Sequence, residues 1–116
     1  MAFDFEKFEV YKKAKGFIGE ISGLIAKMKG VHPRIVDQLQ RASLSIPLNI
    51  AEGAGRYTKA DKRNFYIIAR GSIFECVAVI DILHDMGKIS GQIKDDYYRT
   101  LEELSKMVSG LINSQK

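Results

Sequence analysis

Cysteine and proline are scarce in this sequence of 116 residues, which has one cysteine and two prolines. The single cysteine, Cys76, cannot form a disulfide within the chain, and no His or Cys cluster with metal-ligand spacing surrounds it. Few prolines and many aliphatic residues exclude a disordered or collagen-like chain. The unpaired thiol favours a reducing compartment, so we expect a cytoplasmic protein.

Long apolar runs are also missing. Arg70, Glu75 and Asp81 interrupt the longest of them well short of a membrane span, and the opening MAFDFEKFEVYKKAKG mixes acids and bases without an apolar signal core. We therefore expect no membrane segment and no export. The length suits one domain, residues 1–116, whose folding can bury roughly two-thirds of the surface that the unfolded chain exposes.

Catalytic groups are sparse. The two histidines, His32 and His84, have no obvious catalytic companion. Asp81 and His84 have the spacing of a ligand pair, but a di-iron bundle requires that pair twice together with further glutamates, and no second copy exists. Cys76 falls at a core position. We expect no catalytic residue, no metal, no cofactor and therefore no enzymatic activity.

Apolar residues recur every three or four positions through most of the chain, which predicts amphipathic helices. Helix bounds follow from local signals: Gly30 and Pro33, a capping box at Thr58–Asp61, Gly87 and Ser90. We predict helices near 5–29, 33–54, 58–86 and 90–113. Because short links make successive helices antiparallel, the fold class is all-α, an up-down-up-down four-helix bundle. The predicted core stripe of the third helix is Phe65, Ile68, Ser72, Cys76, Val79, Leu83 and Met86.

The two middle helices carry more apolar residues than one core requires. In the second helix a polar seam separates the core face from a second apolar strip. The seam is Gln38, Arg41, Ser45, Asn49 and Glu52, and the second strip is Leu44, Leu48 and Ala51. The third helix has an extra strip of Ile67, Gly71, Phe74, Ala78 and Ile82. Exposed apolar strips usually mark an interface, so we expect self-association through these residues. The alternative is a locally broad core in a monomer.

Pro47 lies inside the second helix, where a proline removes one backbone hydrogen bond and clashes with the preceding turn. We expect a bend there, with Ser43, Ser45 and Asn49 satisfying the disturbed groups. Arg41 and Glu52 could pair across the seam or with a neighbouring subunit, which would fix the register of the assembly. The alternative is that Asn49 and Glu52 are functional contacts.

Charge is unevenly distributed, although the net charge is only +4. Residues 56–70 contain five basic residues against one acidic residue, whereas residues 71–103 contain three against seven. In an antiparallel bundle the basic residues gather at one pole, which can attract a phosphate backbone. The candidate nucleic-acid-binding residues are Lys12, Lys13, Arg56, Lys59, Lys62, Arg63, Tyr66 and Arg70, with Tyr66 stacking on an unpaired base. The alternative is a solvated helix face.

The run LSIPLNIAEGAGR at 44–56 is the most distinctive stretch. Together with DQLQRAS before it, EC at 75–76, the opening FEKFEVYKKA and the closing LSKMVSGLI, it resembles the proteins encoded in intervening sequences of bacterial 23S ribosomal RNA genes. This resemblance implies a four-helix bundle that assembles as a ring-like homopentamer. It also implies kinship with the accessory variability protein of diversity-generating retroelements, a basic pentameric barrel that binds nucleic acid and a reverse transcriptase.

We therefore expect a non-enzymatic homo-oligomer, a pentamer by resemblance, that contacts RNA or DNA. A protein partner such as a reverse transcriptase is implied by the kinship alone. The alternative function is a protein-binding scaffold with no nucleic-acid contact.

Overall fold

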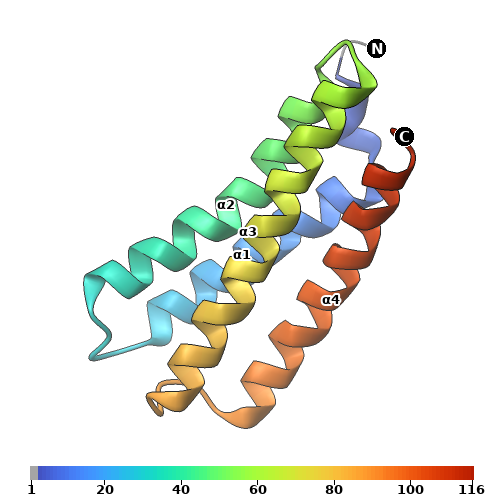
Figure 1. Ribbon diagram of the computed structural model, residues 1–116. Helices are drawn as coiled ribbons and strands as arrows, with labels where there is room; N and C mark the ends of the chain where they lie inside the picture. The colour runs from blue at the N-terminus through green and yellow to red at the C-terminus, as the bar shows by residue number, and fades with distance from the viewer. Residues whose placement is uncertain (1–2) are drawn as a thin grey trace.

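The computed structural model describes residues 3–116, all of whose regular elements are helical (Figure 1). A 3₁₀-helix, η1 (Asp4–Lys7), precedes α1 (Glu9–Lys27), α2 (Pro33–Ala54), α3 (Lys59–Asp85) and α4 (Gly91–Asn113). The bounds of α2, α3 and α4 agree closely with the sequence prediction. The first helix differs, because the extended backbone of Phe8 separates η1 from α1.

The four α-helices form a compact bundle of 45 × 21 × 21 Å, in which each helix packs against the next and α4 also packs against α1. Successive helices run in opposite directions, so both termini and the α2–α3 connection lie at one end (Figure 1). The predicted antiparallel four-helix bundle is confirmed. We call this end the basic pole, because the basic residues of the two terminal segments and of the α2–α3 corner meet there.

Local capping explains where the helices begin and end. The hydroxyl of Thr58 accepts a hydrogen bond from the Asp61 N–H at 3.1 Å, and that of Ser90 accepts one from the Ile93 N–H at 3.2 Å. Gly87, with φ of +72°, ends α3 in a left-handed conformation, and the Lys88 N–H donates to the Leu83 carbonyl at 2.9 Å. α2 continues as an α-helix through the buried Pro47.

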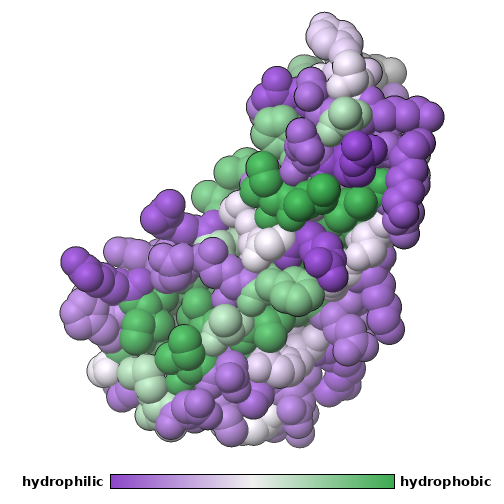
Figure 2. All heavy atoms as spheres, viewed as in Figure 1, coloured by the Kyte–Doolittle hydropathy of each residue, from purple (hydrophilic) through white to green (hydrophobic). Residues whose placement is uncertain are grey.

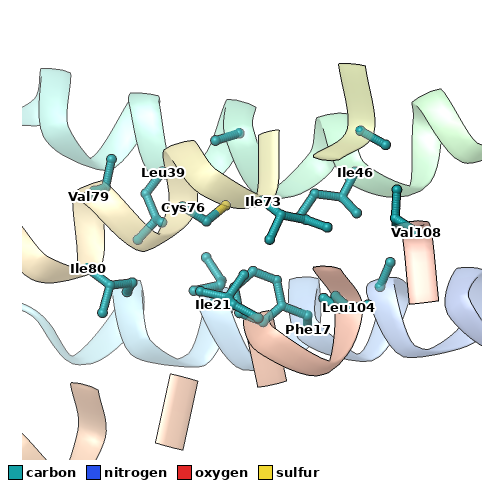
Figure 3. Packing of buried hydrophobic residues seen from close by; sticks show 14 of the residues in the cluster. Phe17, Ile21, Leu39, Ile46, Ile73, Cys76, Val79, Ile80, Leu104 and Val108 are labelled. Carbon is teal, nitrogen blue, oxygen red and sulfur yellow. The ribbon is translucent and has the colours of Figure 1, made fainter. Parts of the chain in front are cut away.

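All four α-helices contribute to one core. Phe17 of α1 lies beside Leu104 of α4, and Ile46 of α2 and Ile73 of α3 lie across the core from them (Figure 3). Burying a side chain of this size contributes about 1.5–3 kcal/mol relative to leaving it in water. This core holds the outward faces of α2 and α3 in fixed relative positions.

The predicted core stripe of α3 is partly wrong. The buried residues of α3 are Tyr66, Ala69, Ile73, Cys76, Val79, Ile80 and Leu83, whereas Ile68 and Met86 are exposed and Ser72 is half-buried. The helix is apolar on several sides, so spacing alone fits more than one orientation. Packing against α2 decides the orientation: a Cβ atom at Gly53 would lie 2.7 Å from the Tyr66 ring, so the missing side chain makes room for that ring.

Candidate assembly and nucleic-acid surfaces

The outward face of α2 carries an apolar ridge, which consists of Leu44, Leu48 and Ala51. Leu44 is 49% exposed and Leu48 is 57% exposed, while Ala51 is half-buried. In Figure 2, α2 and α3 face the viewer, and apolar side chains extend along this side of the molecule with polar residues between them. The α2 ridge thus has no cover within the chain.

The polar seam lies along the junction of α2 with α3 and joins the two helices. The hydroxyls of Ser45 and Ser72 lie 2.8 Å apart, and the Asn49 side-chain amide donates to both the carbonyl and the hydroxyl of Ser45 at 2.8 Å. The Gln38 amide donates to the Glu75 carboxylate. Except at Arg41, the seam is therefore hydrogen-bonded within one chain, and it separates the α2 ridge from the outer face of α3.

Arg41 and Glu52 do not pair within the chain. The Glu52 carboxylate instead accepts from the Arg56 guanidinium at 2.7 Å, one helical turn away. The two residues are eleven positions apart on α2, which is about 16 Å along the helix axis. Their side chains are too short to meet over this distance. Arg41 has no ion-pair or hydrogen-bond partner among the described residues.

The outer face of α3 carries the second apolar surface. Ile67 is 50% exposed, Phe74 is 54% exposed, and Ile82, Gly71 and Ala78 are also exposed. We call these five residues the α3 strip. The Arg70 guanidinium lies over the Phe74 ring, 4.7 Å from its centroid. Arg70 therefore belongs to this apolar surface as much as to the basic pole.

An apolar groove between α3 and α4 adjoins the α3 strip, and the sequence analysis did not identify it. It has a volume of about 440 Å³. Its lining residues are Ile73, Phe74, Val77, Asp95, Tyr98, Arg99, Leu101, Glu102 and Ser105. The floor is aliphatic and aromatic, and charged side chains of α4 form the rim. No repeat within α4 alone indicates it, because three of the nine lining residues come from α3.

At the basic pole, several of the predicted nucleic-acid residues bind the protein itself. The Lys62 ammonium donates to the Ala54 carbonyl at the end of α2, and the Arg63 guanidinium donates to the Gln115 carbonyl, each at 2.8 Å. The Arg56 guanidinium, besides pairing with Glu52, lies 4.5 Å from the Phe65 ring centroid. These three cations join the ends of α2, α3 and α4.

The lysines of α1 have acidic neighbours. Lys12 pairs with Glu9 at 3.4 Å and Lys13 with Glu103 of α4 at 2.5 Å. The hydrogen bond from Lys13 lowers the pKa of the Glu103 carboxyl below its ordinary value. Lys59 is exposed and has no such partner among the described residues. Lys59, and Lys12 with its exposed partner Glu9, are thus candidate residues at the basic pole whose cations a phosphate can reach.

The predicted exposure of Tyr66 is wrong. Its side chain is only 2% exposed, packs against Gly53, and has a pKa raised by burial. A ring in this position cannot stack on a base. The residue lies toward the core because α3 is rotated relative to the orientation that the sequence predicted.

The two histidines have separate surroundings. His32 accepts a hydrogen bond from the Arg34 N–H at 3.1 Å as the N-cap of α2, and the Nδ1 atom of His84 is buried with no partner in the described part of the chain. Among residues 3–116, His, Cys, Asp and Glu side chains do not form a group of three that could hold a metal ion. Within the same residues, none of the helices has a segment long and apolar enough to cross a membrane.

The fold and its surfaces define a small four-helix-bundle protein with uncovered apolar faces on α2 and α3. The model of the 23S rRNA-intervening sequence protein family matches residues 6–110. Since this range is most of the chain, the protein belongs to that family, which confirms the resemblance found in the sequence. A search of curated proteins finds no match.

Proposed function

We propose that this protein is a non-enzymatic homo-oligomer that binds nucleic acid through its basic pole. The observation that supports assembly is the exposure of Leu44, Leu48, Ile67 and Phe74, each about half uncovered on helices whose core faces are already packed. The resemblance implies five copies. The single buried thiol, Cys76, is compatible with a cytoplasmic site of action.

Burial of these apolar side chains provides the driving force. Completing the burial of a half-exposed Leu, Ile or Phe stabilises the buried state by roughly 1 kcal/mol, half the value for a fully exposed side chain. Several such side chains from each partner supply energy comparable with the lower estimates of the entropic cost of association. Patches of this kind on small soluble domains usually mark an interaction site.

Light scattering of Phe74→Glu tests the assembly. A carboxylate at the centre of the α3 strip should dissociate the oligomer, while circular dichroism should show unchanged helicity, because Phe74 lies outside the core. Ile93→Glu is the matched control, since Ile93 is an exposed aliphatic residue of α4 whose neighbours are Gly23 and Tyr97, away from the strip. A Phe74 variant with the mass of the wild-type assembly would place the interface elsewhere.

The arrangement of subunits determines how strongly the basic pole attracts a phosphate backbone. In a ring whose subunits point the same way, Lys12 and Lys59 repeat around one rim, where they attract a phosphate backbone without reading its sequence. Arg56, Lys62 and Arg63 raise the positive potential there even though their side chains bind the protein. Arg70 lies farther along α3, over Phe74.

Salt-dependent binding of a generic single-stranded RNA tests this contact. Lys12→Glu with Lys59→Glu should weaken binding and make its salt dependence shallower, without changing the oligomer. Lys27→Glu with Lys29→Glu makes the same charge change on exposed lysines at the opposite end of α1 and should bind like the wild type. Wild-type protein that does not retain RNA at low salt would refute the nucleic-acid contact.

A protein-binding scaffold is the second candidate function. The supporting observation is that Lys62 and Arg63 cap carbonyls and that Arg56 and Lys13 have carboxylate partners, so much of the charge stabilises the bundle itself. On this hypothesis the surfaces serve assembly and a protein partner, such as the reverse transcriptase that the resemblance implies. The RNA-retention experiment separates the two candidates.

A further inference from the structure

Tyr57 is the most exposed large apolar or aromatic side chain among residues 3–116. Its exposed fraction is 101%, whereas those of the next two, Phe3 and Leu48, are 64% and 57%. The ring makes no aromatic, cation–π or hydrogen-bond contact within this part of the chain. Both of its faces are therefore open to a partner.

The corner between α2 and α3, which carries Tyr57, is held on both sides of that residue. The Arg56 N–H donates to the Gly53 carbonyl at 3.1 Å, and the Lys62 N–H donates to the Thr58 carbonyl at 3.0 Å. The corner forms the tip of the basic pole, beyond the sides of the bundle along which α2 and α3 run (Figure 1). A ring whose backbone is already fixed loses little conformational entropy when it binds.

Cations flank Tyr57 on both sides. Arg56 precedes it, and Lys59, which is exposed and has no partner in the described part of the chain, follows two residues later. Proteins that bind single strands combine these two elements, because an aromatic ring stacks on a base while a cation attracts the phosphate backbone. A duplex keeps the faces of its bases inside the stack, so the exposed ring fits an unpaired base.

A hollow of about 280 Å³ lies beside the ring. Its lining residues are Ala51, Glu52, Gly55, Arg56, Tyr57 and Asp61. The Glu52 carboxylate accepts from Arg56 at 2.7 Å, whereas the Asp61 carboxylate has no partner among residues 3–116. A free carboxylate repels a phosphate but accepts hydrogen bonds from a base.

The chemistry of the bases selects guanine for this hollow. An ionised carboxylate has two acceptor oxygens and no donor. The Watson–Crick edge of guanine presents two adjacent donors, N1–H and the 2-amino group, which match the two oxygens of Asp61. The other bases place an acceptor beside each donor on that edge, and this acceptor would face the carboxylate.

We propose that Tyr57 stacks on an unpaired base of a single-stranded nucleic acid, and that Asp61 selects guanine by accepting hydrogen bonds from its Watson–Crick edge. This inference rests on the proposed nucleic-acid contact and specifies what the basic pole binds. Tyr57 takes the stacking role that the sequence analysis gave to Tyr66, whose ring is buried.

Fluorescence tests the stacking directly, because the chain contains no tryptophan. In Tyr57→Trp, a short oligouridine with one central guanosine should quench the new fluorescence to saturation, since the base stacks on the indole ring. Ile93→Trp is the control, because Ile93 is exposed near the start of α4, at the end of the bundle opposite the corner, and its fluorescence should not change. Binding of the oligonucleotide to Tyr57→Trp without quenching would overturn the stacking.

Affinity measurements separate this inference from the proposal on which it rests. Tyr57→Leu should weaken binding of the same oligonucleotide about fivefold or more and leave its salt dependence unchanged, because the ring contacts no phosphate. Tyr57→Phe keeps the ring and should bind like the wild type. If the wild type binds and Tyr57→Leu binds equally well, the stacking is refuted and the nucleic-acid contact stands. A wild type that does not bind at low salt refutes the contact itself.

The choice of base tests Asp61. The wild type should bind the oligouridine with a central guanosine more tightly than one with a central adenosine, whether the strands are RNA or the corresponding DNA, because the contact is to the base. Asp61→Asn should abolish this preference. Asp85→Asn removes the same charge at the other end of α3 and should retain it. Equal affinity of the wild type for the two oligonucleotides would refute the role of Asp61.

Discussion

Replacing Gly53 by alanine should destabilise the protein, although alanine is the better helix former. A Cβ atom at this position would lie 2.7 Å from Cε1 of Tyr66, 3.0 Å from its Cδ1 and 3.0 Å from Cβ of Phe65. Real Cβ atoms do not approach a ring carbon so closely, and the ring is buried, so α2 or α3 must shift. Overpacking of this kind costs about 1–3 kcal/mol.

The same substitution on α1 provides the reference. Gly19 is exposed in the middle of the helix, and a Cβ atom there would have no neighbour within 4 Å. Gly19→Ala should therefore raise the free energy of unfolding by up to about 1 kcal/mol, the difference in helix propensity between the two residues. Propensity largely cancels when the two variants are compared, so Gly53→Ala should be less stable than Gly19→Ala by about 1–3 kcal/mol.

Urea unfolding followed by circular dichroism measures this difference. Both variants and the wild type must be compared at one protein concentration, because self-association makes stability depend on concentration. Thermal unfolding should show the same order, with about 4 °C for each kcal/mol in a domain of this size. If Gly53→Ala were as stable as Gly19→Ala, the close approach of Tyr66 to α2 would be refuted.

Further variants and measurements test three local features. Thr58→Ala removes the N-cap of α3 and should lower the free energy of unfolding by about 1 kcal/mol, measurable by urea titration; no change would show that the cap is dispensable. Gly87→Ala should cost about 1–2 kcal/mol in the same assay, because φ is +72° there, and a neutral result would contradict the left-handed turn. Burial, and secondarily the charge of Glu75, raise the pKa of the Cys76 thiol from 9.0 to about 12. The native protein should therefore resist alkylation at pH 8 until urea unfolds it, and fast labelling of native protein would contradict the burial. The folded pKa exceeds the unfolded one, so this stabilisation is complete below pH 9 and is lost as pH rises toward 12. Cys76→Ala should lose less stability than the wild type over that interval.

Helix positions were predictable from the sequence because their signals are local. Pro33, Thr58, Gly87 and Ser90 act on backbone groups within four residues of themselves, so their effect needs no tertiary contact. The distinctive run at 44–56 likewise indicated the family that the match over residues 6–110 shows. The surplus apolar residues of α2 and α3 were also recognisable, since periodicity alone places them outside one core face.

Only the tertiary structure decided which way α3 faces. Its apolar residues surround the helix, so their spacing is consistent with burying either Ile68 or Tyr66, and the space left by Gly53 on α2 selects Tyr66. The contact of Arg63 with Gln115 and the α3–α4 groove likewise join segments distant in the sequence, and the contact of Lys62 with Ala54 joins two different helices. Helix bounds follow from interactions between neighbours in the chain, whereas the rotation of a helix and the availability of its charges depend on the shapes of the helices packed against it.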